Sequence, residues 1–242
     1  MLYFYVVNLI IDQGNTRTKL AIFDEKKIVR EAIFSKNEQA KTEKWLEKHH
    51  NEFQNVLISS VTDIELKISV SKIIRLDHTT DLPIFNKYKT PQTLGNDRLA
   101  NAVGAWAKNP QKNSLVIDLG TCIKYDLVSA DGAYLGGNIS PGLEMRYKAL
   151  NHYTDKLPLL KAGEIDFNYG VDTPTSLMEG VQHGIYHEIN GFIERYSEEM
   201  GQLTIFMSGG DLKYFDKEYK SPIFADSTLT LFGLNEILKH NA

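Results

Sequence analysis

The sequence predicts an α/β protein of two related halves, in each of which a β-hairpin leads a mixed sheet flanked by helices. An apolar run that ends in Asp-x-Gly occurs twice, at residues 9–14 (LIIDQG) and 115–120 (LVIDLG). A threonine and a further strand-like run follow both copies. Self-similarity at this spacing indicates duplication of a hairpin-led domain and not a short-period solenoid.

The first half begins with an apolar run, which we interpret as a strand at residues 3–11. No basic residue precedes this run and no small-residue cleavage site follows it, so it does not resemble a secretion signal. It is also too short to span a bilayer. β-Branched and aromatic residues predict further strands at 17–24 and 27–34. Residues 38–49 carry Ala40 and Trp45 among charged residues, a helical pattern.

Short apolar runs then predict strands at 56–60 and 73–76. The alanine-rich residues 94–108 predict a helix that ends before Asn109-Pro110. The polar stretch 108–113 is the best linker candidate, so we expect domains at 1–112 and 113–242. The second half predicts these elements: strands 115–119, 124–128, 133–139 and 203–207, and helices 141–150, 175–198 and 228–239, the last of which can pack back on the first domain.

Composition excludes several classes of protein. The chain has 242 residues, of which 42% are hydrophobic and 24% charged, as in ordinary globular proteins. With a net charge of -4 and a pI near 6.0, it has no global basic field, and we expect neither nucleic acid nor membrane as a partner. The single cysteine, Cys122, cannot form an internal disulfide, which fits a reducing cytoplasm.

The two Asp-x-Gly turns are the main candidates for chemistry. In the first, Gly14 lets the backbone bring amide groups close to a phosphate, and Asp12 can hold Mg²⁺ beside it, directly or through water. The same residues also make a good hairpin turn. Asp118 and Gly120 repeat the pattern in the second half. Two such turns on related domains can hold a nucleotide from both sides, as in actin, hexokinase and Hsp70.

Other motifs are weaker when taken singly. Neither a P-loop nor a dinucleotide-binding glycine motif is present. Residues 136–142 and 207–211 are glycine-rich loops after strands, which suit either close approach of a ligand or a simple turn. Asp97 and Arg98 open a helix, where they are either capping residues or a base and an anion-binding group. His183 and His187 have metal-compatible spacing, but no third ligand is evident.

In their order along nearly the whole chain, these motifs resemble those of type III pantothenate kinases. The matching segments are residues 12–19, 88–98, 118–121, 136–142, 170–173, 208–211 and 229–234. The resemblance implies two duplicated actin-like (ribonuclease H-like) ATPase domains. It also implies ATP-dependent phosphorylation of pantothenate, the first step of coenzyme A synthesis, by a cytoplasmic homodimer that uses Mg²⁺ and a monovalent cation, K⁺ or NH₄⁺.

The resemblance further implies roles for individual residues. Asp97 would be the general base, and Asp118 would hold the monovalent cation. The ATP and phosphate contacts would be Asp12, Gln13, Gly14, Asn15, Thr16, Arg17, Thr18, Lys19 and Thr121. The pantothenate contacts would be Tyr88, Gly95, Asn96, Asp97, Arg98 and Thr173.

The sequence departs from the family at Cys122 and Lys124, where the family more often shows alanine and threonine. Lys124 adds a positive charge near the cation site: either it points into solvent, or it alters the cation requirement. Two other functions stay open. A sugar-type kinase would share the ATP motifs and differ in residues 88–98, and a nucleotide-binding regulator would keep the fold without turnover.

Overall fold

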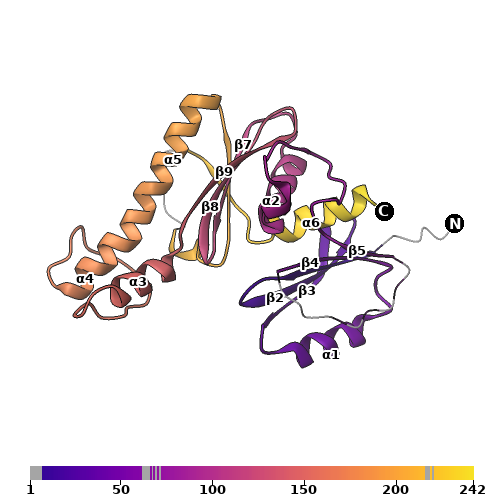
Figure 1. Ribbon diagram of the computed structural model, residues 1–242, viewed down its shortest axis with the longest axis horizontal. Coiled ribbons are helices and arrows are strands. Elements are labelled where there is room, and N and C mark those ends of the chain that lie inside the picture. Colours follow the sequence, from indigo (N-terminus) through magenta and orange to yellow (C-terminus); the bar gives the residue numbers. More distant parts are fainter. Residues whose placement is uncertain are drawn as a thin grey trace. The chain divides into compact units, whose positions relative to one another are not determined.

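The computed structural model describes residues 7–61, 66, 68, 70, 72–215, 219 and 221–242, and the chain divides into two compact units. The first unit comprises Met1–Lys108 and Thr228–Ala242, and the second comprises Asn109–Ser227. Figure 1 shows the helices and strands of both units. The expected start of the first strand, at residues 3–6, lies outside the described residues.

A five-stranded mixed sheet forms the centre of the first unit, with the strand order β3-β2-β1-β4-β5. β2 pairs antiparallel with both β1 and β3, whereas β1, β4 and β5 run parallel to one another. The strands are β1 (Val7–Gln13), β2 (Arg17–Asp24), β3 (Lys27–Ser35), β4 (Asn55–Ser60) and β5 (Lys72–Arg75), which confirms the strands expected in this half over the described residues.

Helices cover both faces of this sheet. Side chains alternate between the two faces along each strand, so each face can pack against its own helices. Leu9 and Ile11 of β1 pack in one core cluster with Leu46 of α1. On the other face, Asn8 Nδ2 donates a hydrogen bond of 2.9 Å to Asn235 Oδ1 of α6. Asp12 lies four residues after Asn8 on β1, so its side chain is on the same face of the sheet, the one that α6 covers. The helices of this unit are α1 (Gln39–His49), α2 (Asn96–Lys108) and α6 (Leu229–His240).

α2 and α6 approach each other backbone to backbone. A Cβ added at Gly233 would lie 1.7 Å from the carbonyl oxygen of Ala100, so only glycine fits there. Nearby, the buried Thr230 hydroxyl donates a 2.7 Å hydrogen bond to Asn101 Oδ1. The end of the chain is therefore built into the first unit.

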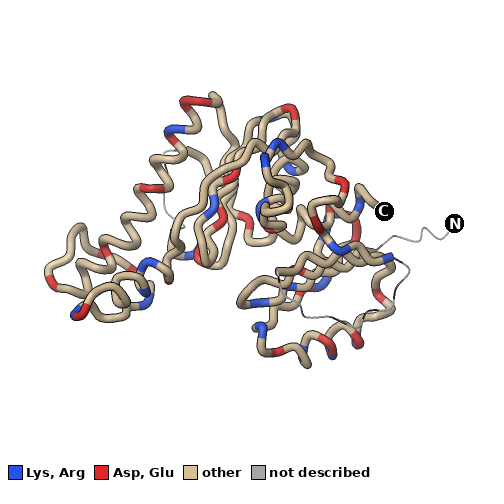
Figure 2. Tube along the Cα trace, in the orientation of Figure 1, with Lys and Arg blue, Asp and Glu red and all other residues tan. Residues whose placement is uncertain are grey.

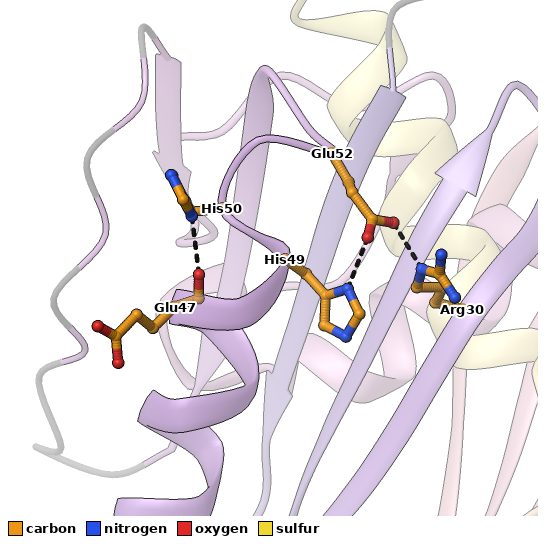
Figure 3. Close-up of polar contacts among 5 residues, drawn as sticks. All are labelled: Arg30, Glu47, His49, His50 and Glu52. Atoms are coloured by element: carbon orange, nitrogen blue, oxygen red, sulfur yellow. Dashed lines mark hydrogen bonds and ion pairs between the residues drawn. The ribbon is translucent and has the colours of Figure 1, made fainter.

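Glu52 ties the end of α1 to β3. Its carboxylate accepts hydrogen bonds from His49 Nδ1 at 2.7 Å and from Arg30 Nε at 2.5 Å (Figure 3). These two bonds, the one from His49 first, hold the pKa of Glu52 below its ordinary value of 4.5. In the same turn, His50 Nδ1 donates to the carbonyl oxygen of Glu47 at 2.7 Å.

The sheet of the second unit repeats the topology of the first. Its strands follow the order β9-β8-β7-β10-β11, with two antiparallel pairs followed by two parallel pairs. These strands are β7 (Ser114–Leu119), β8 (Cys122–Val128), β9 (Ala133–Pro141), β10 (Thr204–Ser208) and β11 (Ile223–Ala225). The duplication inferred from the Asp-x-Gly runs therefore extends to the order and direction of the strands.

The helical part of the second unit differs in detail from the expectation. The single helix expected at 175–198 is divided into α4 (Thr173–Met178), a π-helical segment (Glu179–His183) and α5 (Gly184–Met200), whose buried Ile185, Ile189, Ile193 and Tyr196 pack on the sheet. After Asp211, the chain forms a 3₁₀ turn at Leu212–Tyr214. The remaining element of this unit is α3 (Leu143–His152), and the first unit also contains the short β6 (Phe85–Asn86) and a 3₁₀ turn at Pro91–Thr93.

Charge and hydropathy are distributed as in a globular protein. Lys and Arg are interspersed with Asp and Glu along the elements of both units (Figure 2). Within the described parts of the chain, no helix has the length and apolar character needed to cross a membrane.

Candidate active site

One edge of the first sheet gathers the carboxyl ends of three parallel strands. Asp12, near the end of β1, lies opposite Ser59 of β4. Beyond the end of β5, the amide of Leu76 donates a 2.9 Å hydrogen bond to the carbonyl oxygen of Ile58. In α/β sheets the carboxyl ends of parallel strands are where ligands bind. Half-buried Asp12 is thus an accessible acid at the expected edge.

The hairpin after Asp12 is a tight turn with an exposed tip. The amide of Gly14 donates to the carbonyl oxygen of Arg17 at 2.9 Å, which closes the turn. Asn15 and Thr16 lie exposed at its tip. Exposed amides and hydroxyls at such a turn are suitable donors for phosphate oxygens.

Lys19 lies directly opposite Asp12 in the β1–β2 register, so both side chains are on the same face of the sheet. Gln13 and Thr18, which alternate with them, are buried at 3% and 7% exposure. Of the eight residues predicted at 12–19, Asp12, Lys19 and the turn are at least partly exposed, whereas Gln13 and Thr18 are buried, and their contact with ATP stays a prediction.

The start of α2 is tied to the same edge. Asn96 Nδ2 donates a 3.0 Å hydrogen bond to the carbonyl oxygen of Leu76, just beyond the end of β5. Because neighbouring strands lie about 4.8 Å apart and β4 separates β1 from β5, the strand whose end Asn96 contacts lies roughly 10 Å from the strand of Asp12. The predicted base and the predicted phosphate turn thus share one edge of one unit.

Gly95 fixes the position of the Asp97 carboxylate. Asp97 Oδ1 accepts a 2.9 Å hydrogen bond from the amide of Arg98. A Cβ added at Gly95 would lie 2.6 Å from that same Oδ1 atom, well inside ordinary contact. The absence of a side chain at residue 95 is therefore what lets the carboxylate occupy this place.

Arg98 is a buried cation beside an aromatic ring. Its side chain is only 4% exposed, and the guanidinium carbon lies 5.7 Å from the centre of the Tyr88 ring. A guanidinium held in this way is well suited to bind a carboxylate or phosphate in bidentate fashion. Tyr88 and Arg98, both predicted to contact the acceptor substrate, are thus brought together.

In the second unit, Asp118 is already bound to a cation of this chain. Lys124 Nζ donates a 2.8 Å hydrogen bond to Asp118 Oδ2, and the two side chains are 17% and 13% exposed. Lys124 therefore does not extend into solvent. Lys124 departs from the family pattern in the sequence, but only the cross-strand register, which pairs it with Asp118, reveals the contact.

Two further glycine motifs converge on the turn that follows Asp118. A Cβ at Gly209, whose φ is +103°, would lie 2.3 Å from the carbonyl oxygen of Leu119. The amide of Asp211 donates to that oxygen at 3.0 Å. A Cβ at Gly142 would lie 2.3 Å from the carbonyl oxygen of Thr121. The loops at 136–142 and 207–211, weak as separate motifs, form one glycine-lined surface around Thr121.

Thr173 is placed elsewhere in the second unit. It begins α4, and Asp172 caps the helix by accepting hydrogen bonds from the hydroxyl and the amide of Thr175, at 2.6 and 2.9 Å. These bonds hold the pKa of Asp172 below its ordinary value. Figure 1 shows α4 well apart from β7 within this unit, so the role of Thr173 stays a prediction.

Asp12 and its turn fit Mg²⁺ bound together with phosphates better than a metal ion held by protein side chains alone. In the described ranges no group of three or more His, Cys, Asp or Glu could hold a metal ion, and His183 Nδ1 instead contacts Glu179 Oε2 at 2.5 Å. Mg²⁺ commonly binds through one or two carboxylates together with substrate phosphates. Asp12 beside an anion-binding turn meets that requirement.

Comparison with known proteins identifies close relatives. A family model described as type III pantothenate kinase matches residues 8–195. A type III pantothenate kinase from Phocaeicola vulgatus is 46% identical over 242 residues, which cover 97% of this chain and 99% of that protein.

Solved structures share the fold at lower identity. A Campylobacter jejuni protein described as a Baf family transcriptional activator aligns with a TM-score of 0.60 at 21% identity, over 96% of this chain and 98% of that one. An inorganic polyphosphate/ATP-glucomannokinase from Arthrobacter aligns with a TM-score of 0.51 at 14% identity, over 98% and 100%. These likenesses confirm the expected fold class, that of the actin-like sugar kinases.

Proposed function

This chain belongs to the type III pantothenate kinase family, and from that premise we propose which of its residues carry a phosphoryl group from ATP to pantothenate. The reaction yields 4′-phosphopantothenate and ADP, and it opens the biosynthesis of coenzyme A. In phosphoryl transfer the transition state is loose, so the protein mainly positions the reactants and neutralises charge.

We propose ATP contacts for residues of each Asp-x-Gly turn. The exposed tip of the first hairpin donates amides and hydroxyls to the terminal phosphates, and Lys19 adds positive charge. Thr121, in the glycine-lined turn of the second unit, contacts ATP. Asp12 holds Mg²⁺, which when bound offsets negative charge on the phosphates. The support is the repeated topology, which gives both turns the same position in their sheets.

On the acceptor side, Asp97 accepts the proton of the primary hydroxyl of pantothenate as that oxygen attacks the terminal phosphorus. The bond from phosphorus to the bridging oxygen of ADP breaks, and ADP leaves. Because Asp97 is held at the strand edge that carries Asp12, it can act on a hydroxyl close to the phosphates. General-base assistance of this kind typically contributes ~10²–10⁴-fold.

Arg98 pairs with the carboxylate of pantothenate. Its burial against Tyr88 removes competing water, so an anionic acceptor is bound better than a neutral sugar. The neighbouring Gly95 and Asn96 complete this acceptor segment, and Thr173 contributes a further contact.

We further propose a cytoplasmic homodimer with no nucleic-acid or membrane partner. Large apolar side chains are exposed between α3 and α4, at Tyr153, Leu159, Tyr169 and Val171. Exposed apolar residues that gather in one segment commonly mark an interface. Sedimentation of the purified protein at twice the monomer mass supports the dimer, and a monomer at micromolar concentration contradicts it.

The observation that carries this proposal is the shared edge of Asp12, Asp97 and the buried Arg98. An acceptor screen tests it: ADP release is measured with ATP, Mg²⁺ and pantothenate, or with glucose or N-acetylmannosamine in its place. We expect turnover with pantothenate alone. A sugar that turns over faster would favour the sugar-kinase alternative, and nucleotide binding without turnover would favour the regulator.

A further inference from the structure

The ion pair between Lys124 and Asp118 is built into the second hairpin. The two residues are direct cross-strand partners in the β7–β8 register, so their side chains lie on the same face. The Nζ–Oδ2 distance of 2.8 Å is that of a charge-assisted hydrogen bond, and both side chains are largely buried. This lysine is held by the sheet, unlike a long side chain on an open surface.

The first unit has the same cross-strand register at the equivalent place. Lys19 is the direct register partner of Asp12, as Lys124 is of Asp118. Residues 14–16 connect the two strands of the first hairpin, and residues 120–121 connect those of the second. The second turn is shorter, but a lysine lies opposite the aspartate in both hairpins. Each half of this chain thus carries its own positive charge beside its Asp-x-Gly turn.

This arrangement does not fit a free monovalent cation at Asp118. A potassium or ammonium ion bound to the same carboxylate would lie roughly 4 Å from the lysine ammonium. At an effective dielectric constant of about 20, the repulsion between two such charges weakens binding by roughly 10³-fold. The family resemblance implies a free monovalent cation at Asp118, but in this chain the Lys124 ammonium already contacts that carboxylate.

We infer that the Lys124 ammonium takes the place of the monovalent cation, so that this kinase needs neither K⁺ nor NH₄⁺ for activity. The inference rests on the proposed function, because the cation would act beside the ATP contact at Thr121. A bare Asp118 carboxylate near that turn would repel the triphosphate. Lys124 neutralises it without any ion from solution.

The test replaces Lys124 with threonine, whose hydroxyl offers an oxygen ligand and whose β-branched side chain suits a strand. Pantothenate-dependent ADP release is measured in tetramethylammonium chloride and in KCl at equal ionic strength. We expect the unmodified enzyme to change less than two-fold between the salts. The Lys124→Thr variant should be at least ten-fold less active without K⁺ and should recover with it. As a matched control, Lys27→Thr removes an exposed lysine from β3 and should respond to salt like the unmodified enzyme.

A second measurement separates this inference from the proposed function. Thermal unfolding is followed in both salts: K⁺ should raise the Tm of Lys124→Thr and leave that of the unmodified protein unchanged. If the unmodified protein is activated ten-fold or stabilised by K⁺, the inference is overturned, even if Lys124→Thr fails to fold. If pantothenate is not phosphorylated in either salt, the proposed function fails, and the Tm comparison still decides whether Lys124 excludes the ion.

Discussion

Replacing Gly95 with alanine should displace the general base without disturbing the nucleotide site. The new methyl group would lie 2.6 Å from Asp97 Oδ1, whereas ordinary contact begins at 3.4 Å. The carboxylate must therefore move by the difference, 3.4 − 2.6 = 0.8 Å, or rotate away. Misplacing a reacting group by about 1 Å can cost ~10²-fold in rate, so we expect kcat to fall by roughly 10- to 100-fold.

The assay for Gly95→Ala is steady-state ADP release with pantothenate varied at saturating ATP, together with ATP binding by calorimetry. We expect the Kd for ATP to stay within two-fold. Gly191→Ala is the matched control, because a Cβ at this position in α5 has nothing within 4 Å. It should leave kcat unchanged and stabilise the helix by up to about 1 kcal/mol. A Gly95→Ala enzyme with at least half the normal kcat would refute the role assigned to this contact.

Two further predictions concern the stability of the first unit, which contains both tryptophans, Trp45 and Trp106, and so can be followed by intrinsic fluorescence. Gly233→Ala should lower the free energy of unfolding in urea by about 3 kcal/mol or more, because the added Cβ would overlap the Ala100 carbonyl oxygen and force α2 away from α6. An unchanged urea midpoint would contradict this packing. Glu52→Gln should destabilise by up to about 1 kcal/mol at pH 7, since the side chain is partly exposed. The folded pKa of Glu52 is lowered, so its contribution is present above the unfolded value of 4.5 and is lost as the pH falls through the folded pKa. The urea midpoints of the two proteins should therefore converge as the pH falls below 4.5, and a gap that does not narrow on acidification would show another cause.

Much of the fold was predictable because it depends on local patterns. The paired Asp-x-Gly runs predicted the duplication, and the strand and helix expected at 17–24 and 38–49 lie at Arg17–Asp24 and Gln39–His49. The break at Glu179–His183 was not predictable, because π-helical segments are rare and occur mostly as single turns inside α-helices. The three-residue strand β11 (Ile223–Ala225) is too short to give an alternating pattern, and it depends on pairing with β10.

The candidate site was likewise only partly predictable from the sequence. Asp97 stood out as an acid at a helix start, and the family resemblance implied its role as the base. The sequence does not show that Asn96 attaches this helix start to the end of β5. Nor does it show that Lys124 binds Asp118, because that contact depends on which residues face each other across the hairpin. Residue types and spacings predict chemistry, whereas strand register and close backbone contacts decide which groups meet.

The most direct measurement compares Asp97→Asn with the unmodified enzyme in pantothenate-dependent ADP release and in ATP binding. The amide keeps the size of the side chain and the hydrogen bond that Oδ1 accepts from Arg98, but it cannot take up the proton of the attacking hydroxyl. We predict a kcat lower by ~10²–10⁴-fold with a Kd for ATP within two-fold. A kcat within a few-fold of the unmodified enzyme would contradict the account of the acceptor side.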